Sequence, residues 1–173
     1  MIFTGIKRKS NQLFFNKKAK EFVENNSKQV SAKIKSVIIL ADESCDKNKL
    51  VNEVSYQLKL DDKSITIITI DKKNVKSEIE NGVFTPKDFG WYGRIKSEEL
   101  KSILTKKYDL LINYSKIDNL YNNLVLLQCN SNFKVGFAHL DNRFYDLLIN
   151  CKFKEISLFN KELKKYLTIL NKI

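Results

Sequence analysis

Short apolar runs separated by stretches of helical periodicity restrict how this chain can fold more than any other feature. Residues 34–41, 64–70 and 108–114 are nearly continuous apolar runs, rich in β-branched side chains. Runs of this length predict strands that are buried on both faces, as in a parallel sheet. Weaker strand signals follow at residues 133–137 and 145–151.

Between these runs, apolar residues recur at the 3.6-residue period of amphipathic helices. The predicted helices cover residues 47–58, 97–106, 117–129 and 160–170. Strands that alternate with helices along a chain pair in parallel and are covered by those helices. The sequence therefore predicts an α/β fold, a three-layer sandwich with a mostly parallel, Rossmann-like sheet of four to five strands.

The region before the first predicted strand has helical periodicity of its own. Phe15, Ala19 and Val23 fall at helical spacing, and most of the lysines lie off that stripe. We therefore predict a basic amphipathic N-terminal helix over residues 1–33. The α/β domain then covers residues 34–173 and ends in a basic helix. The N-terminal helix has two open alternatives, packing on the domain or projecting from it.

The formal net charge of +11 lies at the two ends of the chain. Residues 1–35 hold nine Lys or Arg and two acids, and residues 152–173 hold six Lys and two acids. The 116 residues between them hold 16 of each sign. An AT-rich genome explains why 28 of the 31 basic residues are Lys, but it does not explain a neutral middle. Basic ends on a neutral domain predict a polyanionic partner.

Motifs for cofactors and metals are missing from the sequence. Cys45, Cys129 and Cys151 are far apart and His139 is the only histidine, which argues against a structural zinc site. Residues 41–50, after the first strand, contain no glycine, so they do not form a phosphate-binding loop. We predict no cofactor and no metal. Unpaired cysteines, without a signal peptide or a long apolar span, predict a cytoplasmic protein.

Residues 84–96 form an aromatic loop in which aromatic side chains are interleaved with cations. The loop contains Phe84, Lys87, Phe89, Trp91, Tyr92, Arg94 and Lys96. Aromatic faces beside cations suit the unpaired bases and phosphates of RNA. Two other interpretations stay open. The loop folds back on the sheet to hide its aromatic side chains, or it docks another protein.

The N-terminal basic helix carries the strongest functional signal. A lysine-rich helix of this kind lies on RNA phosphates. The same pattern also fits a solvated face or, as a less favoured partner, an anionic membrane surface. The candidate RNA-binding residues of the whole chain are Lys7, Arg8, Lys9, Lys17, Lys18, Lys20, Lys28, Lys87, Trp91, Tyr92, Arg94, Lys96, Lys161, Lys164 and Lys165.

The alternative to RNA binding is a small or degenerate enzyme. Ligands of an open parallel sheet bind beyond the carboxyl ends of its strands. Asp42, Asp71, Asn113 and His139 follow predicted strands and would line such a pocket. Acids at strand ends are also common helix caps, so we assign no catalytic residue.

A resemblance to a family of uncharacterised α/β proteins from Bacteroidota is carried by residues 37–44, 84–97, 108–114, 133–137 and 163–173. It covers nearly the whole chain and implies a cytosolic bacterial protein without established chemistry. Residues 108–114 and 133–137 also resemble, more weakly, the N-terminal half of heptosyltransferase-like glycosyltransferases. Those enzymes hold the nucleotide sugar on a second Rossmann domain, for which 173 residues leave no room.

The sequence as a whole predicts a non-catalytic RNA-binding protein. A neutral compact domain with basic helical ends is typical of ribosomal and ribosome-assembly proteins, whose termini lie on rRNA phosphates. We therefore expect the partner to be rRNA or the ribosome, with no transmembrane segment in the chain.

Overall fold

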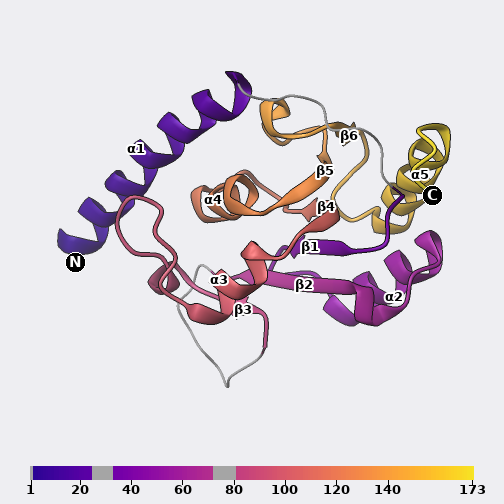
Figure 1. Cartoon of the computed structure of the whole chain (residues 1–173), viewed down its shortest axis with the longest axis horizontal. Helices are drawn as coiled ribbons and strands as arrows, with labels where there is room; N and C mark the ends of the chain where they lie inside the picture. The colour runs from indigo at the N-terminus through magenta and orange to yellow at the C-terminus, as the bar shows by residue number, and fades with distance from the viewer. Residues whose placement is uncertain (1, 25–32, 72–80) are drawn as a thin grey trace.

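Over the described residues, the fold is an open sheet of six parallel strands with helices on both faces (Figure 1). The computed structural model describes residues 2–24, 33–71 and 81–173. The strands are β1 (Val37–Ala41), β2 (Ile65–Ile70), β3 (Val83–Phe84), β4 (Tyr108–Tyr114), β5 (Ser131–Phe137) and β6 (Leu147–Ile149). Their order in the sheet is β3-β2-β1-β4-β5-β6, and each neighbouring pair is parallel. This order is that of a doubly wound Rossmann-like sheet, which confirms the predicted fold class.

The sheet has one strand more than the four to five that we predicted. β3 is two residues long and pairs with the end of β2, Val83 opposite Thr69 and Phe84 opposite Ile70. Two residues are too few to show the alternation by which a strand is recognised in a sequence. Of the two, only Phe84 is buried.

Two helical layers bury the two faces of the sheet. The helices are α1 (Ile2–Glu24), α2 (Lys47–Leu58), α3 (Glu98–Thr105), α4 (Leu120–Gln128) and α5 (Ile156–Ile169). α2 and α5 cover one face, and α1, α3 and α4 cover the other (Figure 1). Side chains of β1 alternate between the two cores, because successive residues of a strand point to opposite faces. Val37 and Ile39 belong to one core, and Ile38 and Leu40 to the other.

α1 packs on the domain, where the sequence had left packing or projection open. Phe15 and Ala19 are buried against the α4 side of the sheet, and the ring of Phe15 lies 5.6 Å from that of Phe144. One residue of the predicted stripe is wrong, because Val23 is 49% exposed. Leu13 is also exposed, whereas Asn11 is fully buried. The buried face of α1 is therefore partly polar, and its polar side chains need hydrogen-bond partners elsewhere in the domain.

The boundaries of α2 and α3 agree with the sequence prediction, whereas a capping residue moves the start of α4 and a buried ring moves that of α5. Of the N-terminal helix predicted over residues 1–33, residues 1 and 25–32 lie outside the described residues, and residue 33 is not helical. α2 covers the predicted residues 47–58. α4 begins later than predicted, because the Asn119 side chain accepts hydrogen bonds from the first-turn amides and so caps the helix. α5 begins earlier than predicted, at Ile156, so that the fully buried Phe159 joins its apolar face.

A buried polar chain fastens α2 and α5 to the sheet. The hydroxyl of Tyr114 on β4 donates a hydrogen bond to Oδ1 of Asn160 on α5. Nδ2 of Asn160 in turn donates to Oε2 of Glu53 on α2 over 3.0 Å. Burial, and then the charge of Glu53, hold the pKa of Tyr114 well above its usual value, so the phenol keeps its proton.

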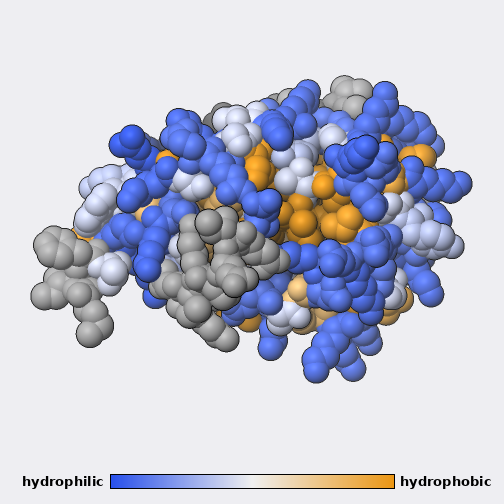
Figure 2. All heavy atoms as spheres, turned by 90° about the horizontal axis from the view of Figure 1, so that it is seen from below, coloured by the Kyte–Doolittle hydropathy of each residue, from blue (hydrophilic) through white to orange (hydrophobic). Residues whose placement is uncertain are grey.

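The surface seen from below is mostly hydrophilic, with one larger apolar area among smaller apolar spots (Figure 2). Figure 2 shows that area in the middle of the molecule, at the position of β2 in Figure 1. The half-buried Leu60 and Ile67 pack against the core from this part of the chain. Among the described helices, none is long and apolar enough to cross a membrane.

Candidate nucleic-acid interface

A tight reverse turn at the tip of the aromatic loop shapes this region. Phe89 pairs with Ile95 in an antiparallel bridge, and the amide of Arg94 donates to the carbonyl oxygen of Trp91 over 3.1 Å. Tyr92 and Gly93, between them, have φ values of 51° and 70°. Two successive left-handed residues define a type I′ turn. The backbone at the tip is therefore fixed, and the Trp91 and Tyr92 side chains remain exposed.

The polar face of α1 holds this turn in place. Nζ of Lys7 donates to the carbonyl oxygens of Pro86 and Phe89 over 3.1 and 3.0 Å. The amide of Tyr92 donates to Oγ of Ser10 over 3.3 Å. These contacts explain why α1 buries polar side chains: they satisfy backbone groups of a loop about eighty residues away in sequence.

Gly93 is the point at which three elements meet. Its amide donates to Oδ1 of Asn11 on α1 over 2.8 Å, and its carbonyl oxygen accepts from Nε2 of Gln128 on α4 over 3.0 Å. The ring of Phe14 lies directly over its Cα, because a Cβ at this position would sit 2.3 Å from Cδ1 of Phe14. Glycine is required here both by the positive φ and by this contact.

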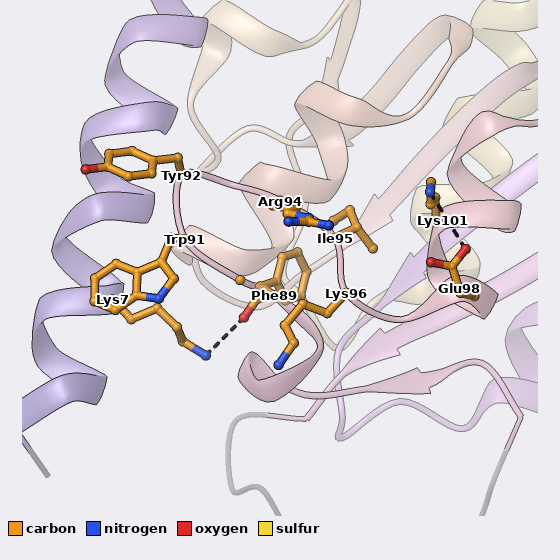
Figure 3. A pocket seen from close by; sticks show the side chains of 10 residues that line it. Lys7, Phe89, Trp91, Tyr92, Arg94, Ile95, Lys96, Glu98 and Lys101 are labelled. Atoms are coloured by element: carbon orange, nitrogen blue, oxygen red, sulfur yellow. Dashed lines mark hydrogen bonds and ion pairs between the residues drawn. The ribbon is translucent and has the colours of Figure 1, made fainter.

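Between α1, the aromatic loop and the start of α3 lies a cavity of about 630 Å³, which we call the loop pocket (Figure 3). Its lining residues are Lys7, Phe89, Gly90, Trp91, Tyr92, Arg94, Ile95, Lys96, Glu98 and Lys101. Four of these residues are cations and one is an acid, so the pocket carries a net positive charge. The acid, Glu98, lies 3.7 Å from Nζ of Lys101, both side chains being exposed.

Electrostatic crowding in the pocket acts on Lys7. Its pKa is lowered from the usual lysine value, first by burial and then by the positive charge of Lys96. The charge of Asp88 opposes this shift. A bound anion would offset the repulsion between the two ammonium groups.

Aromatic side chains of the loop divide into a buried set and an exposed set. Phe84 and Phe89 are buried, and the ring of Phe89 packs 5.1 Å from that of Tyr121. Trp91 is 44% and Tyr92 66% exposed. Within the described residues, neither of these two rings has an aromatic or cationic partner. The folded-back interpretation of the loop therefore holds for its phenylalanines alone.

A model of a family of unknown function, DUF6913, matches residues 7–170. The chain belongs to the DUF6913 family. This match confirms the expected resemblance to an uncharacterised family. It begins at Lys7 and so includes most of α1, the loop pocket and α5 in one unit of the DUF6913 protein. No curated protein and no solved structure matches the chain.

Five of the predicted RNA-binding residues come together in the DUF6913 protein. Lys7, Trp91, Tyr92, Arg94 and Lys96 line the loop pocket. Sequence reasoning missed the fourth cation of the lining, Lys101, because it lies on the exposed surface of a helix that carried no other signal. Its only clue is its place one turn after the start of α3, just beyond the loop.

The other predicted cations of α1 lie outside the loop pocket. Lys9, Lys17 and Lys20 are exposed on the outer face of the helix. Lys18 pairs with Glu21 over 2.6 Å. Arg8 lines a smaller neighbouring cavity at the start of α4.

The remaining predicted cations are dispersed. Lys87 is an exposed residue of the loop that does not line the loop pocket, and Lys28 lies outside the described residues. Lys161, Lys164 and Lys165 belong to α5, on the opposite face of the sheet and at the far end of the DUF6913 protein from α1 (Figure 1). The lysines of α1 and those of α5 therefore form separate surfaces, although the amide of Ile34 donates to the carbonyl oxygen of Lys172 over 2.9 Å.

Polar groups at the carboxyl ends of β1 and β4, where an enzyme of this fold would bind its ligand, satisfy one another. Oδ1 of Asp42 accepts from the amide and hydroxyl of Ser44, and Oδ2 accepts from the amide of Lys116 over 3.3 Å. Nδ2 of Asn113 donates to the hydroxyl of Tyr145 over 2.7 Å. These side chains therefore act as structural bridges between the loops.

Three further groups at this end of the sheet are held by local contacts or by burial. The ring Nε2 of His139 lies 3.2 Å from the carbonyl oxygen of Ser115, and the ring stacks on Phe137. The amide of Asp71 donates to the carbonyl oxygen of Phe84. Burial raises the pKa of Cys45 to about 11, which keeps it a thiol and so a poor nucleophile at neutral pH.

Proposed function

We propose that this protein is a non-catalytic RNA-binding protein and that the loop pocket is its main contact surface. The observation that carries the proposal is that one cavity brings together Lys7, Arg94, Lys96 and Lys101 with Trp91, whose exposed ring has no aromatic or cationic partner among the described residues. Cations attract phosphates whatever the sequence of the RNA, and aromatic faces bind bases.

The outer face of α1 extends the positive surface. Lys9 and Lys20 are eleven positions apart, or about 16 Å along a helix axis. Since α1 packs beside the loop, an RNA strand held in the loop pocket can continue along these lysines. Each contact of this kind adds to affinity and to its dependence on salt.

The separation of the two basic surfaces favours a large partner. Lysines of α5 lie on the opposite side of the sheet from α1, so a short RNA cannot reach both. A ribosomal subunit or an assembly intermediate offers phosphates over a much wider area. We therefore propose association with rRNA in the cytoplasm of a bacterium as the cellular form of this activity.

A glycosyltransferase-like activity has less support. It would need open polar groups at the carboxyl ends of the strands, and Asp42 and Asn113 use theirs in bridging hydrogen bonds.

The test is RNA affinity measured by fluorescence anisotropy, with a labelled single strand of about twelve nucleotides. The variant Arg94→Ala/Lys96→Ala removes two pocket cations. We expect about tenfold weaker binding or more at low salt, and a salt slope smaller by about 1.4, because each cation contributes about 0.7 on a single strand.

Lys106→Ala/Lys107→Ala is the matched control, since it removes two exposed lysines beyond the end of α3. It should change affinity by less than about twofold. Absence of measurable RNA binding by the unaltered protein at about 50 mM salt would overturn the proposal, as would equal losses in the two variants. Sedimentation of the tagged protein through sucrose gradients of lysate then tests the ribosome itself.

A further inference from the structure

We infer that the loop pocket selects unpaired RNA, with one base stacked on the indole of Trp91 and its neighbouring phosphates held by Arg94 and Lys96. This inference rests on the proposed function and specifies the form of RNA that the site takes. Cations alone bind any nucleic acid, because every nucleic acid carries phosphates. An exposed aromatic ring, in contrast, can stack only with a base that is not already stacked on its neighbours.

The indole is placed for this role. Trp91 is 44% exposed although it lines a cavity, and within the described chain no aromatic ring or cation of the protein contacts its ring. An exposed tryptophan costs free energy in water, so its burial by a ligand is favourable. In the view of Figure 3, the indole of Trp91 and the side chain of Lys7 both lie on the α1 side of the pocket, and Lys96 extends from the opposite strand of the loop.

The backbone that carries the ring is also fixed before a ligand arrives. The carbonyl oxygen of Trp91 accepts the hydrogen bond that closes the type I′ turn, and the next two residues are tied to Ser10 and Asn11 of α1. A stacking surface on a fixed backbone loses little conformational freedom when a base arrives.

Charge and size of the pocket limit the occupant. Four lining residues are cations and one, Glu98, is an acid, and this excess of positive charge suits a phosphate on each side of the stacked base. A cavity of about 630 Å³ is in the range that encloses a small ligand. A nucleotide fits that description. A duplex keeps its bases stacked inside and would present only phosphates to the pocket.

Trp91 is the only tryptophan of the chain, so the protein carries its own probe of the site. The experiment titrates the full chain with three RNAs of equal length: a single-stranded oligouridylate, a fully paired duplex, and a single strand with abasic positions. Tryptophan emission and the anisotropy of a labelled RNA are followed together. We expect saturable quenching by the oligouridylate, and little by the duplex or the abasic strand.

Three variants accompany the titration. Trp91→Ala should weaken single-strand binding about 5- to 100-fold, the range for loss of one stacked base, and leave duplex binding within about twofold. Trp91→Phe keeps a ring and should recover most of that loss. Tyr56→Ala, which removes an aromatic ring that is 79% exposed on α2, is the control and should bind as the unaltered protein does.

The salt slope gives an independent reading. Trp91→Ala removes no charge, so its slope should equal that of the unaltered protein, whereas Arg94→Ala/Lys96→Ala should lower the slope. The inference is overturned if RNA binds without quenching, if Trp91→Ala binds single strands as tightly as before, or if it weakens duplex and single strand alike. In each of those outcomes RNA binding itself stands. If no RNA binds at all, the proposed function fails as well.

Discussion

The backbone amide of Gly93 donates a hydrogen bond to the side chain of Asn11 over 2.8 Å, although 82 positions separate the two residues. The bond joins the tip of the aromatic loop to the middle of α1, and it is buried. The packing of α1 and the conformation of the loop therefore depend on each other. Substitutions in α1 that touch no ligand should still alter the pocket.

Asn11→Ala tests that coupling. The change leaves the Gly93 amide buried without an acceptor, which costs about 1–3 kcal/mol. We expect the free energy of unfolding in urea to fall by this amount and RNA affinity to fall with it. Gln12→Ala, at the next and exposed position, should change stability by less than about 0.5 kcal/mol. Equal effects of the two changes would contradict the coupling.

Comparing Gly93→Ala with Gly90→Ala tests whether glycine is required at position 93 itself, and not at every glycine of the loop. At Gly93 the φ is +70° and the added Cβ would meet the Phe14 ring at 2.3 Å, so we expect a loss of about 2–5 kcal/mol. At Gly90 the nearest atom to an added Cβ is 3.4 Å away and the φ is not in the left-handed region. This variant should lose less than about 1 kcal/mol. Thermal unfolding measured by circular dichroism distinguishes them.

Glu53→Ala should damage stability without damaging binding. It removes the carboxylate that accepts hydrogen bonds from the Ser157 hydroxyl and from Nδ2 of Asn160, both on α5, and so leaves Nδ2 of Asn160 buried and unpaired. We expect a loss of about 1–3 kcal/mol in urea. RNA affinity should be unchanged, because α2 lies on the face of the sheet opposite α1. Loss of binding in a folded Glu53→Ala protein would mean that the two faces are coupled.

The Asp109 carboxyl should make the free energy of unfolding depend on pH. Burial would raise the pKa of this carboxyl, but hydrogen bonds from the residue 35 and 36 amides, the Ser36 hydroxyl and Asn132 outweigh burial and lower it. Since the folded pKa is below the unfolded value of about 3.9, the carboxylate contributes stability above that pH. The contribution is lost as pH falls through the folded pKa.

The measurement compares urea unfolding of the unaltered protein and of Asp109→Asn from about pH 6 to about pH 3. Their difference in unfolding free energy should be constant above about pH 5 and shrink below about pH 4. A difference that stays constant down to pH 3 would show that the carboxylate charge is not what the hydrogen bonds stabilise.

Apolar pattern alone was enough to predict most of the fold. The strands β1, β2 and β4 are fully or nearly buried, so continuous apolar runs mark them. β3 was missed because it is two residues long. The docked face of α1 was only partly recognisable, because Ser10 and Asn11 are buried by polar contacts with a loop distant in sequence.

The candidate site was predictable in part for the same reason. Residues 84–96 hold aromatic and cationic side chains close together in sequence, so their spacing alone groups Trp91, Arg94 and Lys96. Lys101 could not be grouped with them, since its place in the pocket depends on how α3 leaves the loop. Separation of α5 from α1 depends on the order of strands in the sheet, which charge counts do not contain.

The type I′ turn at Tyr92 and Gly93 has a consequence for evolution within the family. Because that turn is locked by Asn11 and Gln128, its tip can exchange the side chain at position 91 without disturbing the backbone beneath it. The backbone of the turn can thus stay the same among relatives while the exposed side chain changes. Relatives that keep the asparagine, the glutamine and the glycine but replace the indole would retain the shape and recognise a different ligand.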